Sequence, residues 1–255
     1  MSAETYTEDA ALPPRMLKVI DVSAVQGAID WKAVAGDGIV GAYLKCTEGM
    51  RHSDGRYTSN FTGARDAGIA CGAYHFGKPK TDPGVTPEQD AKSEARRFYT
   101  LSGGLGSAKG EMPPVLDIEV MDDQTPAVVA SWIRVFLAEA EQLFGRVPVI
   151  YTGAPMANAL RLVPTATRHP LWVARYIQNY GQPAMTWEAA HAHPGPLDVP
   201  FMRALPWRPD AWTLWQFSGG MANLPGNRVA GIACDVDCNR FNGGEREWES
   251  FARLA

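Results

Sequence analysis

The feature that most constrains this chain is a regular alternation between short apolar segments and longer amphipathic ones. The short segments are rich in Val, Ile, Tyr and Trp, and many of them are flanked by turn residues, as expected for buried strands. Stretches with helical periodicity lie between them, which is typical of a parallel sheet whose strands are joined by helices. The expected strands are residues 18–23, 39–45, 69–76, 114–119, 147–152, 171–176, 212–217 and 233–238.

Two of the expected helices have well-marked ends. Thr86 and Pro87 suit the start of one helix, and Thr125 and Pro126 suit the start of another, which Gly145 ends. Further helices are expected over residues 58–67 and 245–254.

Helices become scarce toward the end of the chain. Residues 177–211 read as a long connection without helical periodicity, and no helix is expected between the last two strands. An α/β fold is therefore predicted, an irregular TIM-like barrel in a single domain.

Composition excludes several classes of function. The 255 residues carry a formal net charge of −4 without a basic cluster, so no nucleic-acid partner is expected. No apolar run is long enough for membrane insertion. Residues 1–16 lack the features of a secretory signal and are interpreted as a flexible leader before a barrel over residues 17–255. The protein is accordingly expected to be made in the cytoplasm.

The cysteines fit no common metal pattern. Cys46 and Cys71 lie in strand-like segments, where a buried thiol is expected. Whether Cys234 and Cys238 pair is left open, and no metal is predicted.

Carboxylates gather at the ends of the expected strands. Asp117 and Glu119 are two residues apart on one strand, so their side chains point to the same face. Active sites of such barrels lie where the parallel strands end, and crowded carboxylates raise one another's pKa, which keeps an acid protonated near neutral pH. Structural ion pairs or metal ligation are the alternatives. Convergence with Asp21 and the aspartates Asp235 and Asp237 favours catalysis.

Aromatic residues are frequent in the same strands, and sugars rest well on aromatic rings. The residues expected to bind a sugar substrate are Lys45, Glu48, Tyr74, His75, Tyr151, Trp172 and Trp215.

An ordered set of short motifs resembles glycoside hydrolase family 25, the muramidases of bacteria, fungi and phages. The similarity covers about residues 17–245, and an ordered set is far more specific than any single motif. The motifs are Ile20-Asp-Val-Ser23, Lys45 with Thr47-Glu-Gly49, Gly72-Ala-Tyr-His-Phe76, Leu116-Asp-Ile-Glu119, Ile150-Tyr-Thr152, Leu171-Trp-Val-Ala174, Trp215-Gln-Phe217 and Val236-Asp-Cys-Asn239.

The resemblance implies a lysozyme that cleaves the β-1,4 bond between N-acetylmuramic acid and N-acetylglucosamine in peptidoglycan. It implies a barrel of five βα units and three further strands, and it implies no cofactor. Glu119 would be the general acid and Asp117 its neighbouring carboxylate, with Asp21 and Asp237 in support. A role as a phage endolysin, acting on the cell wall after release, fits a chain that shows no signal peptide.

Two other functions remain open at this point. One is a chitinase-like barrel, and the other is a catalytically inactive wall-binding protein; retention of all four acidic residues argues against the second. No obligate protein partner is expected. Because Asp117 and Glu119 share one side of the pocket, attack by the substrate's own acetamido oxygen is predicted, with net retention.

Overall fold

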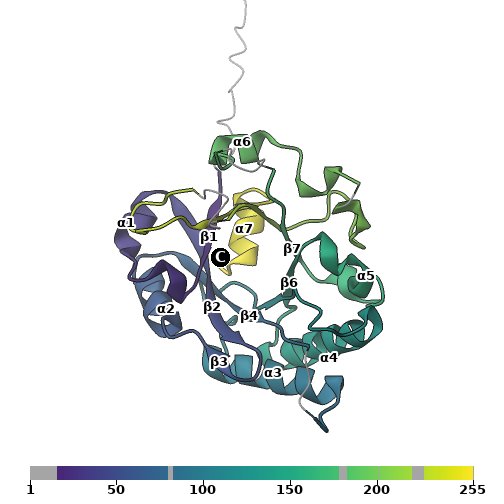
Figure 1. The fold of residues 1–255 in the computed structure, drawn as a ribbon. Coiled ribbons are helices and arrows are strands. Elements are labelled where there is room, and N and C mark those ends of the chain that lie inside the picture. Colours follow the sequence, from purple (N-terminus) through teal and green to yellow (C-terminus); the bar gives the residue numbers. More distant parts are fainter. Residues whose placement is uncertain (1–15, 80–82, 178–182, 201, 220–226, 255) are drawn as a thin grey trace, which may run out of the picture.

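The computed structural model describes residues 16–79, 83–177, 183–200, 202–219 and 227–254, which form a barrel of strands with helices packed around it (Figure 1). The strands are β1 (Lys18–Val22), β2 (Ile39–Glu48), β3 (His52–Ser53), β4 (Ala70–Phe76), β5 (Val115–Asp117), β6 (Val149–Thr152), β7 (Leu171–Ala174), β8 (Leu214–Ser218) and β9 (Asp237–Phe241). The α-helices are α1 (Trp31–Gly36), α2 (Tyr57–Asp66), α3 (Pro87–Ser102), α4 (Pro126–Phe144), α5 (Ala157–Leu160), α6 (Trp187–Ala192) and α7 (Glu245–Phe251).

The sheet closes on itself. Its order is β1-β9-β8-β7-β6-β5-β4-β2-β3, and β1 also pairs with β2, which completes a ring of eight strands. All neighbours in the ring are parallel except around β9, which runs antiparallel to both β8 and β1. β3 forms a hairpin with the end of β2 and stays outside the ring. The predicted irregular TIM-like barrel is confirmed.

Apolar side chains fill two separate layers. The outer layer lies between the strands and the surrounding helices, where α4 contributes one apolar face that includes Ile133, Phe136 and Ala140. The inner layer fills the barrel itself with side chains such as Tyr43 and Trp172, whose rings stack with centroids 4.9 Å apart. The barrel interior is therefore a packed core.

Small residues make this interior packing fit. A Cβ atom at Gly72 would lie 2.2 Å from the Tyr43 ring, so only glycine leaves space for that ring. At the start of β2, a Cβ at Gly41 would lie 2.5 Å from the Trp248 ring of α7. Helix α7 thus closes the end of the barrel where the parallel strands begin.

The predicted helix ends are confirmed. The Thr86 hydroxyl accepts a hydrogen bond from the Gln89 amide at the start of α3, and Thr125 caps α4 in the same way. Gly145 ends α4 in the left-handed conformation, with φ 62°.

Several predicted boundaries were wrong. The last strand was expected over residues 233–238, but β9 begins only at Asp237 because the preceding residues form turns around an isolated bridge between Asn227 and Val236. Residues 177–211 were expected to lack helical structure, yet Thr186 caps α6 within them, and short 3-10 turns follow. The β3 hairpin was not predicted.

The leader expected over residues 1–16 lies, up to residue 15, outside the described residues. Along the described part of the chain, no helix combines the length and apolarity that crossing a bilayer would need.

Candidate active site

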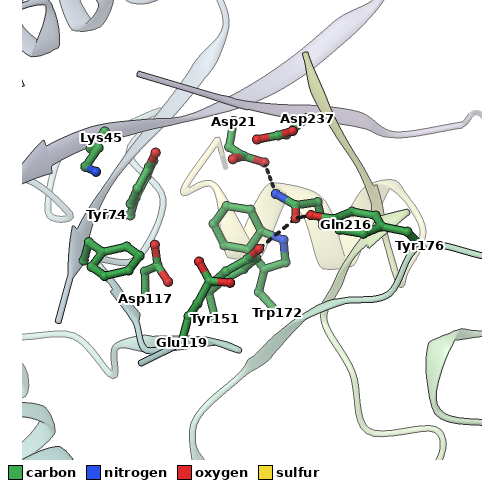
Figure 2. A pocket seen from close by; sticks show the side chains of 11 residues that line it. Asp21, Lys45, Tyr74, Asp117, Glu119, Tyr151, Trp172, Tyr176, Gln216 and Asp237 are labelled. Carbon is green, nitrogen blue, oxygen red and sulfur yellow. Dashed lines mark hydrogen bonds between the residues drawn. The ribbon is translucent and has the colours of Figure 1, made fainter. Parts of the chain in front are cut away.

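A pocket of about 270 Å³ opens at the end of the barrel where the parallel strands finish (Figure 2). Most of its lining comes from strand positions two residues beyond the inner apolar layer. The lining residues are Asp21, Lys45, Tyr74, Phe76, Asp117, Glu119, Tyr151, Trp172, Tyr176, Gln216 and Asp237.

Strand alternation explains why these side chains meet. In β5, Val115 points into the inner apolar layer and Asp117 follows on the same face, whereas Leu116 and Ile118 pack outward against the helices. In β1, Val19 and Asp21 repeat the pattern. The inward residues of these two strands thus change from apolar to ionisable along the strand, so carboxyl groups line the pocket above an apolar floor.

Asp117 and Glu119 form the carboxyl pair on one wall of the pocket. Burial raises the pKa of Asp117 well above its usual range, and the charge of neighbouring Glu119 raises it further. Burial also raises the pKa of Glu119, and a hydrogen bond joins the two groups. Asp117 is only 5% exposed, while Glu119 lies just beyond the strand and is exposed. The raised pKa values favour a proton shared by the pair, and Glu119 is the member nearer the solvent.

Asp21 and Asp237 form a second pair on the opposite wall (Figure 2). They are register partners of the antiparallel strands β1 and β9. Asp237 is the first residue of its strand, and it reaches the same rim as the other acids because β9 runs in the opposite direction. Burial raises the pKa of Asp21 well above its usual range, and the nearby charge of Asp237 adds to this effect.

Two amides fix the orientation of Asp21. Gln216 Nε2 donates to Asp21 Oδ2 at 2.9 Å, and Asn239 Nδ2 donates to the same oxygen at 2.8 Å. The Oε1 atom of Gln216 accepts hydrogen bonds from the hydroxyls of Tyr151 (2.7 Å) and Tyr176. Because phenol donors occupy that oxygen, the Gln216 NH₂ group must face Asp21, which acts as an acceptor.

Aromatic rings form the remaining lining. Trp172 Nε1 donates to Asn239 Oδ1 at 2.7 Å, and the Tyr151 ring meets the Trp172 ring edge-on with centroids 4.7 Å apart. Tyr74 projects from β4 next to Lys45 (Figure 2), and burial raises its pKa well above the usual value. Rigid rings next to hydrogen-bonding groups make a surface suited to a sugar.

The family model for glycosyl hydrolases family 25 matches residues 20–224 of the chain. The chain belongs to this family. Lysozyme M1 of Streptomyces globisporus is 33% identical over 232 residues, which span 88% of this chain and 67% of that protein. Family, fold class and enzyme class, predicted from the sequence, are thereby confirmed, and the protein is a glycoside hydrolase.

Solved structures agree with the observed barrel. A bacterial lysozyme from Streptomyces coelicolor has a TM-score of 0.72 and 30% identity, covering 94% of this chain and 99% of its own. The catalytic domain of an endolysin from a bacteriophage of Listeria monocytogenes is similar in fold, with a TM-score of 0.63 and 22% identity; the match covers 89% of this chain and 93% of that one.

The structure of this family 25 glycosidase brings most of the predicted site residues together. Those in the pocket are Asp21, Lys45, Tyr74, Asp117, Glu119, Tyr151, Trp172 and Asp237. Their individual roles stay predictions. Asp235, the additional acid before β9, points elsewhere and pairs with Arg228, with Nε and Oδ1 2.9 Å apart.

The prediction that His75 binds substrate was wrong. Its side chain is fully buried on the outer face of β4, where its ring stacks on Phe136. It contacts Thr47 Oγ1 at 2.8 Å and Glu94 Oε2 at 2.7 Å. Burial lowers the pKa of His75 to about 3 and raises the pKa of Glu94 to about 8, so the pair is neutral at pH 7.

Trp215 was also wrongly placed in the site. It is fully buried on the outer face of β8, and its Nε1 donates to the Arg175 carbonyl at 2.8 Å. Glu48 lies beside the pocket and not in it, where it accepts a hydrogen bond from Lys45 Nζ at 2.7 Å.

Sequence reasoning missed four residues of the site. Phe76, Tyr176 and Gln216 line the pocket, and Asn239 lies directly behind Asp21. Gln216 could have been found from its position, because an amide between the apolar residues Trp215 and Phe217 needs buried partners.

All four cysteines of the glycosidase are free thiols, so Cys234 and Cys238 do not pair in this structure. Cys46 and Cys71 are buried as expected, and burial raises the pKa of both to about 12. Among the described residues, no group of three His, Cys, Asp or Glu side chains is arranged to hold a metal ion.

Proposed function

We propose that the pocket hydrolyses the β-1,4 bond between N-acetylmuramic acid and N-acetylglucosamine in bacterial peptidoglycan, with net retention. The observation that carries this proposal is the placement of two carboxyl pairs on opposite walls of one aromatic-lined pocket. Lysozyme M1, the relative with 33% identity, is by its name a lysozyme. A glycan strand is the substrate class that fits such walls.

Glu119 is the general acid in this proposal. It is the more exposed member of its pair, so it can reach the glycosidic oxygen of a bound strand. Burial raises its pKa, which favours the protonated form that a general acid needs. In the first step, Glu119 transfers its proton to the leaving oxygen while the bond to the anomeric carbon breaks.

The substrate's 2-acetamido oxygen is the proposed nucleophile. It forms a bond to the anomeric carbon as the leaving group departs, and positive charge develops on the acetamido nitrogen. Asp117, on the same wall as Glu119, accepts a hydrogen bond from the N–H of that group and stabilises the charge. Water then opens the cyclic intermediate after giving a proton to Glu119, and two displacements at one carbon give retention.

Asp21 is a poor candidate for direct attack. Its Oδ2 atom already accepts hydrogen bonds from Gln216 and Asn239, which hold it in place. A water molecule activated from that wall would instead attack opposite Glu119 and give inversion. Following the first-formed anomer by NMR on a soluble glycan separates the two routes: a β product agrees with retention, and an α product overturns it.

The second test of the proposal is Glu119→Gln. The amide keeps the shape of the side chain but cannot deliver a proton, so clearing of purified cell walls should slow by a factor of about 10² to 10⁴. Asp235→Asn, outside the pocket, serves as the matched control. Near-normal lysis by a folded Glu119→Gln protein would contradict the assignment. Efficient hydrolysis of chitin oligomers would favour the chitinase-like alternative, and binding without lysis would favour an inactive wall-binding barrel.

We further propose that the enzyme acts on the cell wall after release from the cytoplasm, without a cofactor and without a nucleic-acid or obligate protein partner. The likeness in fold to an endolysin catalytic domain agrees with such a role. Expression of the chain inside a bacterium, with and without a membrane-permeabilising agent, tests it, because lysis should require the agent.

A further inference from the structure

A second cavity of about 490 Å³ lies beside the catalytic pocket. It is lined by the turn between β2 and β3, by the start of α3, and by the loop after β5; Figure 1 shows β3 and α3 along the same edge of the barrel. Its lining residues are Glu48, Gly49, Met50, Arg51, His52, Lys78, Asp90, Glu94 and Asp122.

The two cavities are neighbours, with Phe76 lining the catalytic pocket and Glu48 lining the second cavity. Lys45 Nζ lies 5.2 Å from the centre of the Phe76 ring, and Lys78 Nζ lies 5.1 Å from it. Glu48 Oε2 is 2.7 Å from Lys45 Nζ, and Glu48 Oε1 is 3.9 Å from Lys78 Nζ. Lys45 lines the catalytic pocket and Lys78 lines the second cavity, so the contacts of Phe76 and Glu48 with both lysines connect the two cavities.

The floor of the second cavity is already hydrogen-bonded. Asp90 accepts a hydrogen bond from Trp132 Nε1 at 2.8 Å, and Glu94 accepts one from the Lys78 amide at 3.2 Å while it contacts His75. These buried groups therefore shape the cavity without needing a ligand.

The rim is different, because it carries an acceptor without a donor. Asp122 Oδ1 is 4.0 Å from Lys78 Nζ, but Asp122 Oδ2 is buried and has no hydrogen-bond partner among the described residues. Asp122 and the following Asp123 both have positive φ angles, 45° and 61°, a conformation that Asp and Asn adopt more readily than most residues other than glycine. A buried acceptor without a donor is uncommon in proteins and is typical of a binding site.

The cavity is also lined by basic side chains. Arg51 is exposed on the hairpin turn, and Lys78 Nζ lies 4.0 Å from Asp122 Oδ1. The turn can approach Lys78 closely because residue 49 is glycine, with φ 50° and a Cβ position 3.2 Å from Lys78 Cβ. The cavity thus offers the positive groups Arg51 and Lys78 together with the carboxylate acceptor of Asp122.

We propose that this cavity binds the short peptide that muramic acid carries in peptidoglycan. The inference rests on the proposed function, because the peptide must be attached to the strand that occupies the catalytic pocket. A stem peptide offers free carboxylates, which suit Arg51 and Lys78, and amide or ammonium N–H groups, which suit Asp122 Oδ2. The peptide is attached to the sugar through the lactyl ether, and it passes the Phe76 ring to reach the second cavity.

The test compares soluble glycan strands that carry their peptides with the same strands after an amidase has removed them. The kcat/KM for release of new reducing ends should be about tenfold higher on the peptide-bearing strands, the worth of one charge-assisted hydrogen bond. Equal values on the two substrates would overturn the inference. Activity on the stripped strands tests the proposed function separately, so the two failures can be distinguished.

Asp122→Asn is the informative variant. Asparagine tolerates a positive φ, so the loop should keep its conformation. The variant should lose most of the peptide preference and keep its activity on stripped strands. Asp123→Asn is the matched control, because it removes the same charge at a positive φ from an exposed side chain outside the cavity. An equal loss of preference in both variants would show a general charge effect and contradict the proposal.

Direct binding gives an independent readout. A free stem peptide added to the wild-type protein should shift the NMR signals of Asp122 and Lys78, and the Asp122→Asn protein should show weaker shifts. Shifts confined to the catalytic pocket, or no shifts at millimolar peptide, would overturn the inference.

Discussion

Replacing Asp117 with asparagine should make the protein more stable while removing its activity. Asp117 is 5% exposed, and its Oδ1 atom has no hydrogen-bond partner among the described residues. Burial, and then the charge of Glu119, raise the pKa of Asp117 well above its usual range. An asparagine side chain has the same shape and no charge, and its NH₂ group can donate to Glu119.

The size of the gain follows from the buried charge that is removed, because asparagine keeps polar atoms at the same positions. A buried group that lacks a hydrogen bond costs about 1–3 kcal/mol, and more when it is charged. A gain of about 2 kcal/mol should raise the Tm of a chain of 255 residues by about 4–8 °C.

The gain should depend on pH in a defined direction. The folded-state pKa of Asp117 lies above that of the unfolded chain, so the folded state binds more protons between the two values. Stability of the wild-type protein therefore falls as pH rises through that window. The advantage of the variant should grow as pH rises through that window, and it should be lost toward pH 4, where wild-type Asp117 is protonated and resembles asparagine.

Calorimetry between pH 4 and pH 8, together with a wall-clearing assay, measures both effects. Asp235→Asn is the control: this acid is paired with Arg228 near the surface, so its loss should change stability by less than about 1 kcal/mol. A lower Tm for Asp117→Asn at pH 7, or a shift that is the same at every pH, would refute the argument.

Three further predictions concern the same site. Asp237→Asn should reduce lysis far more than Asp235→Asn, because only Asp237 lines the pocket; the reverse order in a wall-clearing assay would contradict the site. Gln216→Met removes one of the two amides that lower the pKa of Asp21, so the acid limb of the profile of kcat/KM against pH should move to higher pH; an unchanged limb would count against a role for Asp21. Treatment with a chelator should leave activity unchanged, and a loss that zinc restores would contradict this.

The barrel could be predicted from the sequence because its strands are short apolar segments with helices between them. The starts of two helices could also be predicted, since Thr86 and Thr125 are capping residues followed by proline. The strand β9 was misplaced because turns precede it, and an isolated bridge at Val236 gives no signal in a single sequence.

The acidic residues could be predicted because each is an ionisable side chain in an otherwise apolar strand. Burying a carboxylate costs free energy, so a carboxylate in an apolar segment indicates a functional role. Asp21 and Asp117 both line the pocket. His75 and Trp215 were misassigned because polar or aromatic character was taken as a sign of the site without regard to strand parity. Both residues are neighbours of inward-facing positions, and therefore point outward.

Glu48 shows a limit that parity alone cannot remove. The register between β2 and β4 shifts between Lys45 and Thr47, so the alternation that places Lys45 in the pocket does not continue to the end of the strand. Such an irregularity depends on the pairing of two strands, and nothing in the local sequence reveals it.

Because β1 pairs with β9, the active site can be completed only late in the synthesis of the chain. Asp21 is held by amides 195 and 218 residues away along the chain. A ribosome must therefore release nearly the whole barrel before the first strand can find its last neighbour. We expect a nascent chain to hold Glu119 and Asp117 long before Asp21 and Asp237 meet, and so to be unable to attack a wall. We therefore expect an unfinished chain to leave the cell wall intact.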